Sequence, residues 1–291
     1  MTESNWVYLN GRVVEAKDAQ ISPFDRGFLF GHTAYEVTAV YGGKLVDFAG
    51  HAERLARTLA ALDIPNPHDG EGWRQIHETL ITRNRLGEGL VYLQVTAGAY
   101  GHRDFAGPEA FAPAIFMFTT PRALIGPTAR DGIAAITEAD TRWARRDLKT
   151  TQLVSQVLAY RAARAVGATT AILHEDGIVT EAASANVWIV TADSSLITRD
   201  LSPAILPGIT RAAVIRQLSD IQISVIERAF DLTALRAAAE VFTTSAGALI
   251  APIVTLDGAP VGAGRPGPVT RRVQAAYYAA MGADTATFDG L

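Results

Sequence analysis

One segment sets the interpretation of this chain: Asp140-Thr141-Arg142-Trp143-Ala144-Arg145-Arg146-Asp147-Leu148-Lys149. It ends in one of only three lysines, whereas 23 of the 26 basic residues are arginines. Arginine replaces lysine as a surface cation, but its guanidinium stays protonated and forms no Schiff base. Lys17 and Lys44 lie in polar, turn-like stretches, while Lys149 stands between a strand-like run and an apolar helical run. We therefore interpret Lys149 as a candidate reactive amine; the alternative is an ordinary lysine that opens a helix.

Length and composition describe a globular chain with a large core. The 291 residues, 48% of them hydrophobic, fit one large domain or two ordinary ones. A net charge of −4 with scattered arginines argues against a nucleic-acid surface. The chain has no cysteine, and its six histidines lack ligand-like spacing, so we expect no metal site. No segment reaches a membrane-spanning length and no signal-peptide core is present, so we expect a soluble cytoplasmic protein.

Turn residues and apolar periodicity predict an α/β fold, with α+β character and mixed sheets. Asn10-Gly11 between two strand-like runs is typical of a type I′ hairpin. A helix is expected over 153–166, directly after the lysine segment. The stretch 120–131 carries two prolines and little periodicity. We interpret it as a linker between a small N-terminal domain, 1–119, and a larger C-terminal domain, 132–291.

An acid follows Lys149 by thirty-two residues, within Val179-Thr180-Glu181-Ala182-Ala183-Ser184-Ala185-Asn186. Glu181 interrupts a strand end of apolar and small residues, where a free carboxylate is costly without a cationic partner. A protonated pyridine nitrogen is one such partner. Pyridoxal phosphate needs a lysine to hold it as an imine and an acid beside its ring nitrogen. The alternative partner is one of the many arginines.

Two turns are candidates for holding a phosphate. Leu206-Pro207-Gly208-Ile209-Thr210-Arg211 runs from a Pro-Gly turn into a helix, so two backbone amides would point outward at its positive end. Thr244-Ser245-Ala246-Gly247 would supply further amides. A third glycine-rich stretch, 262–267, fits the dinucleotide pattern G-x-G-x-x-G, but no second strand follows it and no acid lies at the expected distance.

Together these segments resemble the class IV aminotransferases, pyridoxal-phosphate enzymes of fold type IV. The likeness spans nearly the whole chain in the family's order. Besides the segments above it includes Asp25-Arg26-Gly27-Phe28, Tyr35-Glu36, His51-Ala52-Glu53-Arg54-Leu55 and Gly267-Pro268-Val269-Thr270. Within the family, the lysine segment and Ile197-Thr198-Arg199-Asp200-Leu201-Ser202 are most similar to D-amino-acid transaminases.

The resemblance implies a two-domain homodimer with pyridoxal phosphate at the domain interface. It implies that Lys149 is the Schiff-base residue and proton shuttle. It further implies that Glu181 binds the pyridine nitrogen and that Leu206 packs against the ring. Residues implied to hold the phosphate are Arg54, Ile209, Thr210, Ser245 and Ala246.

A transaminase for amino acids must also hold an α-carboxylate, for which two-point binding by an arginine is well suited. The candidate is Arg103, in the loop after the strand-like run 91–96, and Tyr35 is a candidate for a further hydrogen bond. D-amino-acid transaminases typically carry a histidine two places after that arginine. Here Phe105 stands there and His102 precedes the arginine. The alternative is that Arg103 is a solvated loop residue.

These residues favour a ping-pong transfer of an amino group from a D-amino acid to a 2-keto acid, pyruvate or 2-oxoglutarate. An (R)-selective amine transaminase stays open as an alternative. A branched-chain L-amino-acid transaminase is less favoured because Gln94 stands where those enzymes usually carry an arginine, and an aminodeoxychorismate lyase is a weaker alternative. A non-catalytic scaffold of the same fold is disfavoured because both Lys149 and Glu181 are present.

Overall fold

The computed structural model describes residues 5–220 and 223–283, and the chain forms two compact units. Unit 1 comprises Met1–Leu124 with Leu148–Gln152, and unit 2 comprises Ile125–Asp147 with Leu153–Leu291. The chain therefore leaves unit 1 within the stretch 120–131 and returns to it for the five residues around Lys149. The inferred limits of two independently folding domains, 1–119 and 132–291, stay a prediction.

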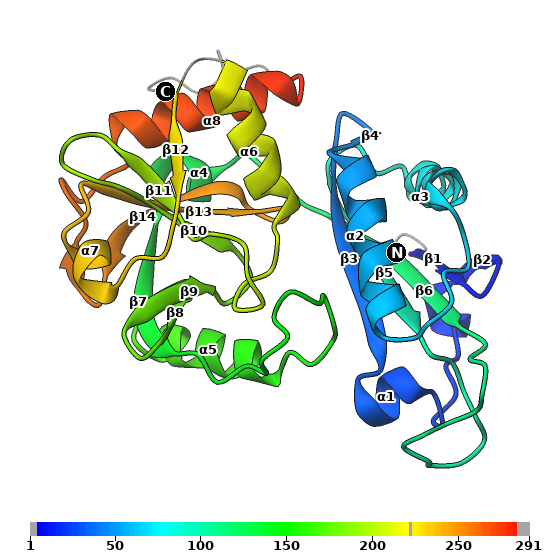
Figure 1. Cartoon of the computed structure of the whole chain (residues 1–291). Coiled ribbons are helices and arrows are strands. Elements are labelled where there is room, and N and C mark those ends of the chain that lie inside the picture. Colours follow the sequence, from blue (N-terminus) through cyan, green and yellow to red (C-terminus); the bar gives the residue numbers. More distant parts are fainter. Residues whose placement is uncertain (1–4, 221–222, 284–291) are drawn as a thin grey trace. The chain divides into compact units, whose positions relative to one another are not determined.

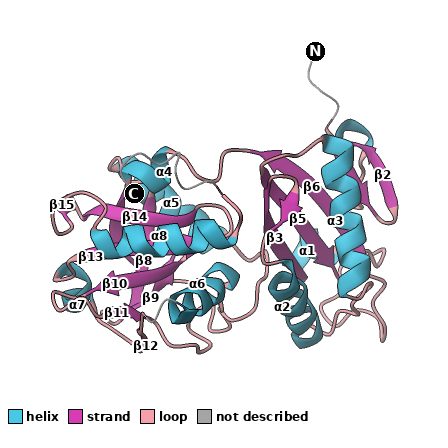
Figure 2. Ribbon diagram, turned by 90° about the horizontal axis from the view of Figure 1, so that it is seen from above, coloured by secondary structure: helices cyan, strands magenta, loops and turns pink. Residues whose placement is uncertain are grey.

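Within its described residues, unit 1 has a six-stranded antiparallel sheet with the order β2-β1-β6-β5-β3-β4. The long helices α2 and α3 cover one face of it (Figures 1 and 2). The strands are β1 (Trp6–Leu9), β2 (Arg12–Glu15), β3 (Thr33–Tyr41), β4 (Lys44–Leu45), β5 (Gly89–Thr96) and β6 (Ala114–Pro121). The helices are η1 (Ala16–Asp18), α1 (Arg26–Phe30), α2 (Phe48–Ala61) and α3 (Gly70–Asn84).

Local sequence explains how unit 1 forms. The predicted hairpin is confirmed: Asn10 and Gly11 have φ values of 47° and 87°, and they join β1 to β2. Leu55 and Leu59 of α2 are spaced at i and i+4, so they share one helix face and are buried against the sheet. The opposite face of β3, β5 and β6 carries a row of stacked rings that includes Tyr35 and Tyr92.

Unit 2 is built on a mixed sheet, nine-stranded in its described residues, with the order β12-β11-β10-β13-β14-β7-β8-β9 and β15 beside β14. Three pairs are parallel: β7 with β8, β14 with β7, and β11 with β12. The strands are β7 (Ile133–Ala139), β8 (Thr170–Glu175), β9 (Ile178–Ala182), β10 (Asn186–Val190), β11 (Leu196–Thr198), β12 (Val225–Glu227), β13 (Glu240–Ser245), β14 (Leu249–Leu256) and β15 (Ala259–Pro260). The helices are α4 (Pro127–Asp131), α5 (Val154–Ala165), α6 (Ile209–Asp220), α7 (Leu232–Arg236) and α8 (Pro268–Ala280).

Helices flank the unit-2 sheet on two sides (Figure 1). The helices α6 and α8 pack against each other and against β13, while α5 packs against β7 and β8. The helix expected over 153–166 is α5, and Gly167 follows it with a φ of 78°. The predicted α/β fold with a mixed sheet is therefore confirmed.

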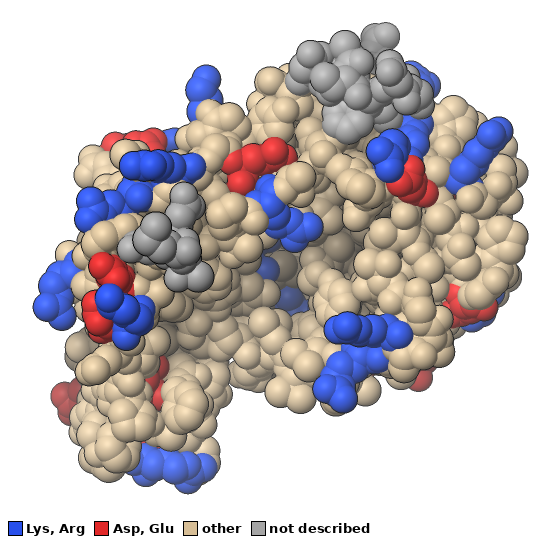
Figure 3. Space-filling view, turned by 180° about the vertical axis from the view of Figure 1, so that it is seen from behind, with Lys and Arg blue, Asp and Glu red and all other residues tan. Residues whose placement is uncertain are grey.

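Three further features concern helix hydropathy, possible metal ligands and surface charge. None of the helices in residues 5–220 and 223–283 combines the length and hydropathy that a bilayer crossing requires. The same residues contain no group of three or more histidine, aspartate and glutamate side chains arranged for a metal ion. On the face drawn in Figure 3, lysine and arginine side chains are dispersed among neutral and acidic ones.

Candidate active site

Lys149 lies beside strand β3 in unit 1. The amide of Tyr35 donates to the carbonyl oxygen of Lys149 at 3.0 Å, and Thr150 forms an antiparallel bridge with Ala34. The lysine segment thus extends the pairing of β3 for a short distance, and backbone hydrogen bonds fix the position of the lysine Cα.

The amine of Lys149 lies over the ring of Tyr35. Its Nζ is 4.0 Å from the ring centroid, a cation–π distance. Tyr35 in turn stacks on Tyr92, with centroids 5.7 Å apart. No hydrogen bond or ion pair joins Nζ to another described residue. The structure therefore brings Lys149 and Tyr35 together and leaves the amine without a carboxylate partner in the described chain.

Behind this pair, Arg54 of α2 is fixed by Glu36 of β3. The Nε and Nη2 atoms of Arg54 donate to Oε1 and Oε2 of Glu36 at 2.7 and 2.8 Å. His51, one turn earlier on α2, contacts Oε2 of Glu36 through Nδ1 at 2.7 Å. All three side chains are buried. Such two-point pairing fixes the plane of the guanidinium.

Burial and charge set the protonation of this group. Burial alone would raise the pKa of Glu36, but the charge and hydrogen bonds of Arg54 outweigh it and hold that pKa well below its usual range. Burial lowers the pKa of His51, and the positive charges of Arg54 and Lys149 lower it further against the pull of Glu36. His51 is therefore neutral, and its Nδ1 donates to the Glu36 carboxylate.

In unit 2, Glu181 is the next-to-last residue of strand β9 and is 4% exposed. Three groups donate to it. The guanidinium of Arg142 forms a short ion pair with Oε1, the side-chain amide of Asn186 reaches Oε2 at 3.1 Å, and the backbone amide of Leu206 lies 3.2 Å from both oxygens. The arginine partner that the sequence left as an alternative is thus present, and it is Arg142.

Arg142 is itself held by a second acid. Its Nε and Nη2 atoms donate to the two oxygens of Asp140 at 3.0 and 2.7 Å. Burial lowers the pKa of Arg142, but Asp140 and Glu181 outweigh it and raise the pKa above the usual value. Burial raises the pKa of Glu181, and Arg142 only partly opposes that effect. The charge of Arg142 therefore favours the ionised form of Glu181.

The turn that precedes α6 is tied to Glu181. Besides the contact through the Leu206 amide, Asn186 donates to the carbonyl oxygen of Leu206 at 2.9 Å. Gly208 is required there, because a Cβ atom at that position would lie 1.9 Å from Oδ1 of Asn186. The amides of Ile209 and Thr210, the first residues of α6, have no acceptor within the described chain. A helix end of this kind attracts an anion.

The second predicted turn joins β13 to β14. The amide of Ala248 donates to Oγ of Ser245 at 3.2 Å, which closes the turn, and the amide of Ala246 has no acceptor among the described residues. Leu249 follows with a φ of 51°, an uncommon value for a side chain of this size. Because α6 lies against β13, both candidate phosphate turns belong to the same part of unit 2.

Two of the predicted substrate residues, Arg103 and His102, lie elsewhere in unit 1. Arg103 and His102 are exposed in the loop between β5 and β6. The guanidinium of Arg103 lies over the rings of Phe105 and Phe30, 4.5 and 5.4 Å from their centroids. No hydrogen bond, ion pair or ring contact within the described part of unit 1 joins either residue to Lys149 or Tyr35.

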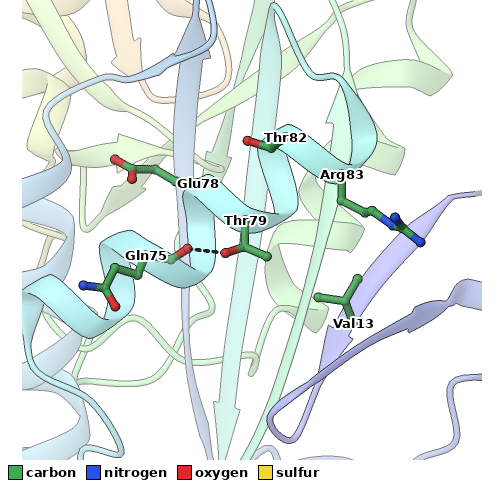
Figure 4. A pocket seen from close by; sticks show the side chains of 6 residues that line it. All are labelled: Val13, Gln75, Glu78, Thr79, Thr82 and Arg83. Atoms are coloured by element: carbon green, nitrogen blue, oxygen red, sulfur yellow. Dashed lines mark hydrogen bonds between the residues drawn. The ribbon is translucent and has the colours of Figure 1, made fainter.

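The described residues of unit 1 line two cavities of similar volume. One of about 700 Å³ lies on α3 beside β2, between Gln75, Thr79 and Arg83, where the Thr79 hydroxyl donates to the Gln75 carbonyl at 2.7 Å (Figure 4). None of the predicted site residues lines it. The other, of about 710 Å³, reaches Gln94, which faces Tyr35 in the β3–β5 register.

Several residues of these groups were not in the predicted site. They are Glu36, His51, Asp140, Arg142 and Asn186. Each of them lies inside a segment quoted above. The signal that could have identified them is a polar residue at a position that a strand would bury, such as Glu36 in the apolar run of β3. Which acid pairs with which arginine depends on the fold and cannot be read from spacing.

The chemistry of these groups fits pyridoxal phosphate. The cofactor needs an amine without a partner, which Lys149 supplies, and backbone amides without acceptors, which Ile209, Thr210 and Ala246 supply. It also needs an acid with acceptor capacity for its ring nitrogen. A carboxylate accepts about four hydrogen bonds, and three groups donate to Glu181.

Comparisons with known proteins agree. Residues 33–256 match the model of the amino-transferase class IV family. The chain is 37% identical to D-alanine aminotransferase of Listeria monocytogenes, over 92% of this chain and 93% of that one. It is 34% identical to D-alanine aminotransferase of Staphylococcus aureus, over 93% and 96%.

Solved structures show the same fold. Branched-chain amino acid aminotransferase of Escherichia coli superposes with a TM-score of 0.88, at 24% identity, over 95% of this chain and 94% of that one. A hypothetical aminotransferase of Mycobacterium tuberculosis in its PLP-bound form gives 0.82, at 24% identity, over 94% and 98%. The predicted family is confirmed: the chain belongs to the class IV aminotransferases, which are pyridoxal-phosphate-dependent enzymes.

Proposed function

We propose that this chain transfers the amino group of a D-amino acid to pyruvate or 2-oxoglutarate in a ping-pong reaction, with D-alanine as the first candidate donor and 2-oxoglutarate as its acceptor. The observation that carries the proposal is the amine of Lys149, which lies over Tyr35 with no acceptor in the described chain. The choice of a D-amino acid is supported by the identity of 37% to D-alanine aminotransferase of Listeria monocytogenes.

In this proposal each residue has a distinct task. Bound pyridoxal phosphate supplies an aldehyde and an electron-withdrawing ring. Lys149 would hold the cofactor covalently through its aldehyde; once the amino group of the donor has displaced the lysine, its free amine would take up the α-proton of the donor and would return a proton in the second half-reaction. Glu181 would accept a hydrogen bond from the protonated ring nitrogen, and Leu206 would pack against the ring. The phosphate would be held by Arg54, Ile209, Thr210, Ser245 and Ala246.

The substrate carboxylate is assigned to Arg103, with hydrogen bonds from Tyr35 and His102. Support for Arg103 comes from its contacts with the rings of Phe105 and Phe30, since a guanidinium that is already oriented loses less entropy when it binds a carboxylate.

A second candidate, an (R)-selective amine transaminase, is favoured by one observation. Phe105 stands where the resemblance implies a histidine, and its ring is 72% exposed beside Arg103. An apolar ring at that position suits an apolar substituent in place of a carboxylate.

We also propose that the enzyme is a cytoplasmic homodimer. The exposed ring of Phe28, 77% accessible, lies in the same unit as Phe105, and a second copy would remove such apolar surface from water. Molar mass by light scattering tests the dimer, and cell fractionation tests the location.

The function is tested by turnover of D-alanine, L-leucine and (R)-1-phenylethylamine with 2-oxoglutarate as the common acceptor, measured side by side on the purified holoenzyme. Pyruvate serves as a second acceptor for L-leucine and the amine only, because D-alanine and pyruvate give no net reaction. We expect the largest kcat/KM for D-alanine with 2-oxoglutarate. A larger value for L-leucine would overturn the proposal, and a larger value for the amine would favour the second candidate.

A further inference from the structure

Arg26, the first residue of α1, holds the backbone of the loop that carries Arg103. Its Nη1 donates to the carbonyl oxygen of Asp104 at 2.6 Å, and its Nη2 donates to that of Phe105 at 2.7 Å. These two carbonyls follow Arg103 directly in the chain. Arg26 is only 4% exposed, so both hydrogen bonds to its charged group are shielded from water.

The guanidinium of Arg26 is itself fixed on every side. It lies 4.9 Å from the ring centroid of Phe30 and 5.2 Å from that of Phe111. Its Nε donates to Nδ1 of His32 at 3.3 Å, and Nε2 of His32 is 2.9 Å from the carbonyl oxygen of Leu62. Because Nδ1 accepts, the imidazole carries its hydrogen on Nε2 and donates it to Leu62. The fork of Arg26 therefore has one orientation.

The loop is shaped to receive this fork. Gly107 has a φ of 75°, and a Cβ atom there would lie 3.1 Å from Nη1 of Arg26 and 2.9 Å from the ring of Phe111. A side chain at that position would displace the guanidinium. The carboxylate of Asp104 closes the loop from within, since it accepts from the amides of Ala106 and Gly107 at 3.3 and 3.2 Å.

The same contacts reach the side chain of Arg103. The rings of Phe30 and Phe105 touch each other, with centroids 5.2 Å apart, and the Arg103 guanidinium lies over both. Arg26 thus fixes the surface on which Arg103 rests in two ways, through the carbonyl of Phe105 and through the ring of Phe30.

We propose that Arg26 is a positioning residue for substrate recognition: by holding the carbonyls of Asp104 and Phe105 it orients Arg103 toward the substrate carboxylate. The inference rests on the proposed role of Arg103. Arg26 is buried away from solvent and acts through the loop alone, so its loss weakens substrate binding and leaves the cofactor chemistry of Lys149 in place.

The test compares Arg26→Gln with Arg271→Gln in the holoenzyme. Arg271 is a matched control, because its guanidinium also forks onto two successive carbonyls, those of Ala129 and Arg130, in unit 2. We expect Arg26→Gln to raise the KM for D-alanine about tenfold while kcat changes less than about threefold. Arg271→Gln should leave that KM within about twofold of the wild type. Arg26→Lys keeps the charge and the aliphatic stem without the fork, so it should resemble Arg26→Gln.

Two further measurements decide how Arg26 acts. Hydrogen exchange of the amides of 102–107 should be faster in Arg26→Gln than in Arg271→Gln, whatever the activity. In an Arg103→Ala background, Arg26→Gln should cause no further rise in KM, because a residue that acts through Arg103 has nothing left to orient.

Each outcome has a definite meaning. Unchanged exchange, or a KM increase that adds fully to that of Arg103→Ala, overturns the inference while the proposed function stands. If Arg103→Ala alone leaves the KM for D-alanine unchanged, the assignment of the carboxylate to Arg103 fails, and the role of Arg26 in recognition fails with it. Turnover of D-alanine by the wild type is measured first. If the wild type turns over D-alanine, the transaminase proposal stands, and the results for Arg26 and Arg103 then test their own roles only.

Discussion

The guanidinium of Arg54 faces the carboxylate of Glu36 at two points, with Nε 2.7 Å from Oε1 and Nη2 2.8 Å from Oε2. Both side chains are nearly inaccessible, at 4% and 2% exposure. A buried pair of this kind adds little compared with apolar packing, but removal of one partner leaves an uncompensated charge. The pair joins α2 to β3, so it links the candidate phosphate arginine to the strand that carries Tyr35.

We therefore expect Glu36→Gln to destabilise the protein strongly. The loss in the free energy of unfolding should be about 3–5 kcal/mol, because Arg54 stays buried without its carboxylate. Urea denaturation at pH 7 measures it. Glu71→Gln is the control: Glu71 pairs with Arg74 at 3.8 Å on the surface, and its loss should cost less than about 1 kcal/mol. Equal losses in the free energy of unfolding for the two variants would show that the buried pair matters no more for stability than the surface pair.

Borohydride reduction of the holoenzyme should fix the cofactor on Lys149 alone. The chain offers an internal control in Lys17 and Lys44, the other two lysines, and Lys17 is paired with Glu15 on the surface. Lys149→Ala should lose the visible absorbance of the bound cofactor and nearly all transamination, by about a thousandfold or more. Lys17→Ala and Lys44→Ala should retain both. Peptide mapping after reduction identifies the labelled lysine, and a Lys149→Ala protein with native turnover would contradict the assignment.

The charge of Arg142 should set the acid limit of activity. Burial raises the pKa of Glu181, and Arg142 opposes it, so removal of Arg142 raises that pKa further. The carboxylate then forms only at higher pH, and the acid limb of the kcat/KM profile of Arg142→Gln should shift upward. Arg145→Gln serves as the control, because Arg145 is exposed and pairs only with Asp147 within the described chain. An acid limb at the same pH in both variants would rule out this role.

Much of the fold follows from local signals in the sequence. The Asn10-Gly11 turn fixes the first hairpin, and apolar spacing fixes α2 and α5, because these patterns express backbone conformation and burial directly. The return of residues 148–152 to unit 1 is different. It depends on the pairing of Lys149 with Tyr35 and of Thr150 with Ala34, more than a hundred residues away, which no local pattern encodes.

The site shows the same division. The sequence offered the candidate groups, a lone lysine and an acid near a strand end, and their roles stay a prediction. It did not identify the partners that tune them, since Glu36 binds Arg54 and Arg142 binds Glu181 through tertiary packing. Nor did it predict that Phe105 would support Arg103 by ring stacking. Polar pairs of this kind become visible only when the elements are packed.

Stability should fall as the pH is lowered below 6.5, because His77 is buried in its neutral form. Burial lowers the pKa of His77 to about 4, from an ordinary value of 6.5. Below pH 6.5 the unfolded chain therefore binds a proton that folded His77 does not, so the free energy of unfolding decreases as the pH falls toward 4. The decrease due to this group is at most about 3 kcal/mol. His51 contributes in the same direction, because burial lowers its pKa too.

Urea denaturation of the wild type and His77→Gln at pH 7 and at pH 4.5 checks this. Because the variant has no ionisable group at position 77, it should lose less stability between the two pH values than the wild type. Nδ1 of His77 donates to the carbonyl oxygen of Trp73 at 2.7 Å, a bond that glutamine is able to keep. Parallel pH dependence in the two proteins would mean that His77 is protonated in the folded state.

Gly208→Ala should weaken cofactor binding without unfolding the protein. The new methyl group would lie 1.9 Å from Oδ1 of Asn186, so that side chain must move. Its bonds to Glu181 and to the carbonyl of Leu206 would then be lost together, and the turn that opens α6 would lose its anchor. We expect the dissociation constant of pyridoxal phosphate to rise about tenfold or more, measured by absorbance titration of the reconstituted enzyme. Gly87→Ala is the matched control, because a Cβ atom there meets nothing within 4 Å. If both variants bound the cofactor equally well, Asn186 would not link Glu181, the candidate partner of the ring nitrogen, to the turn 206–211 that is the candidate phosphate site.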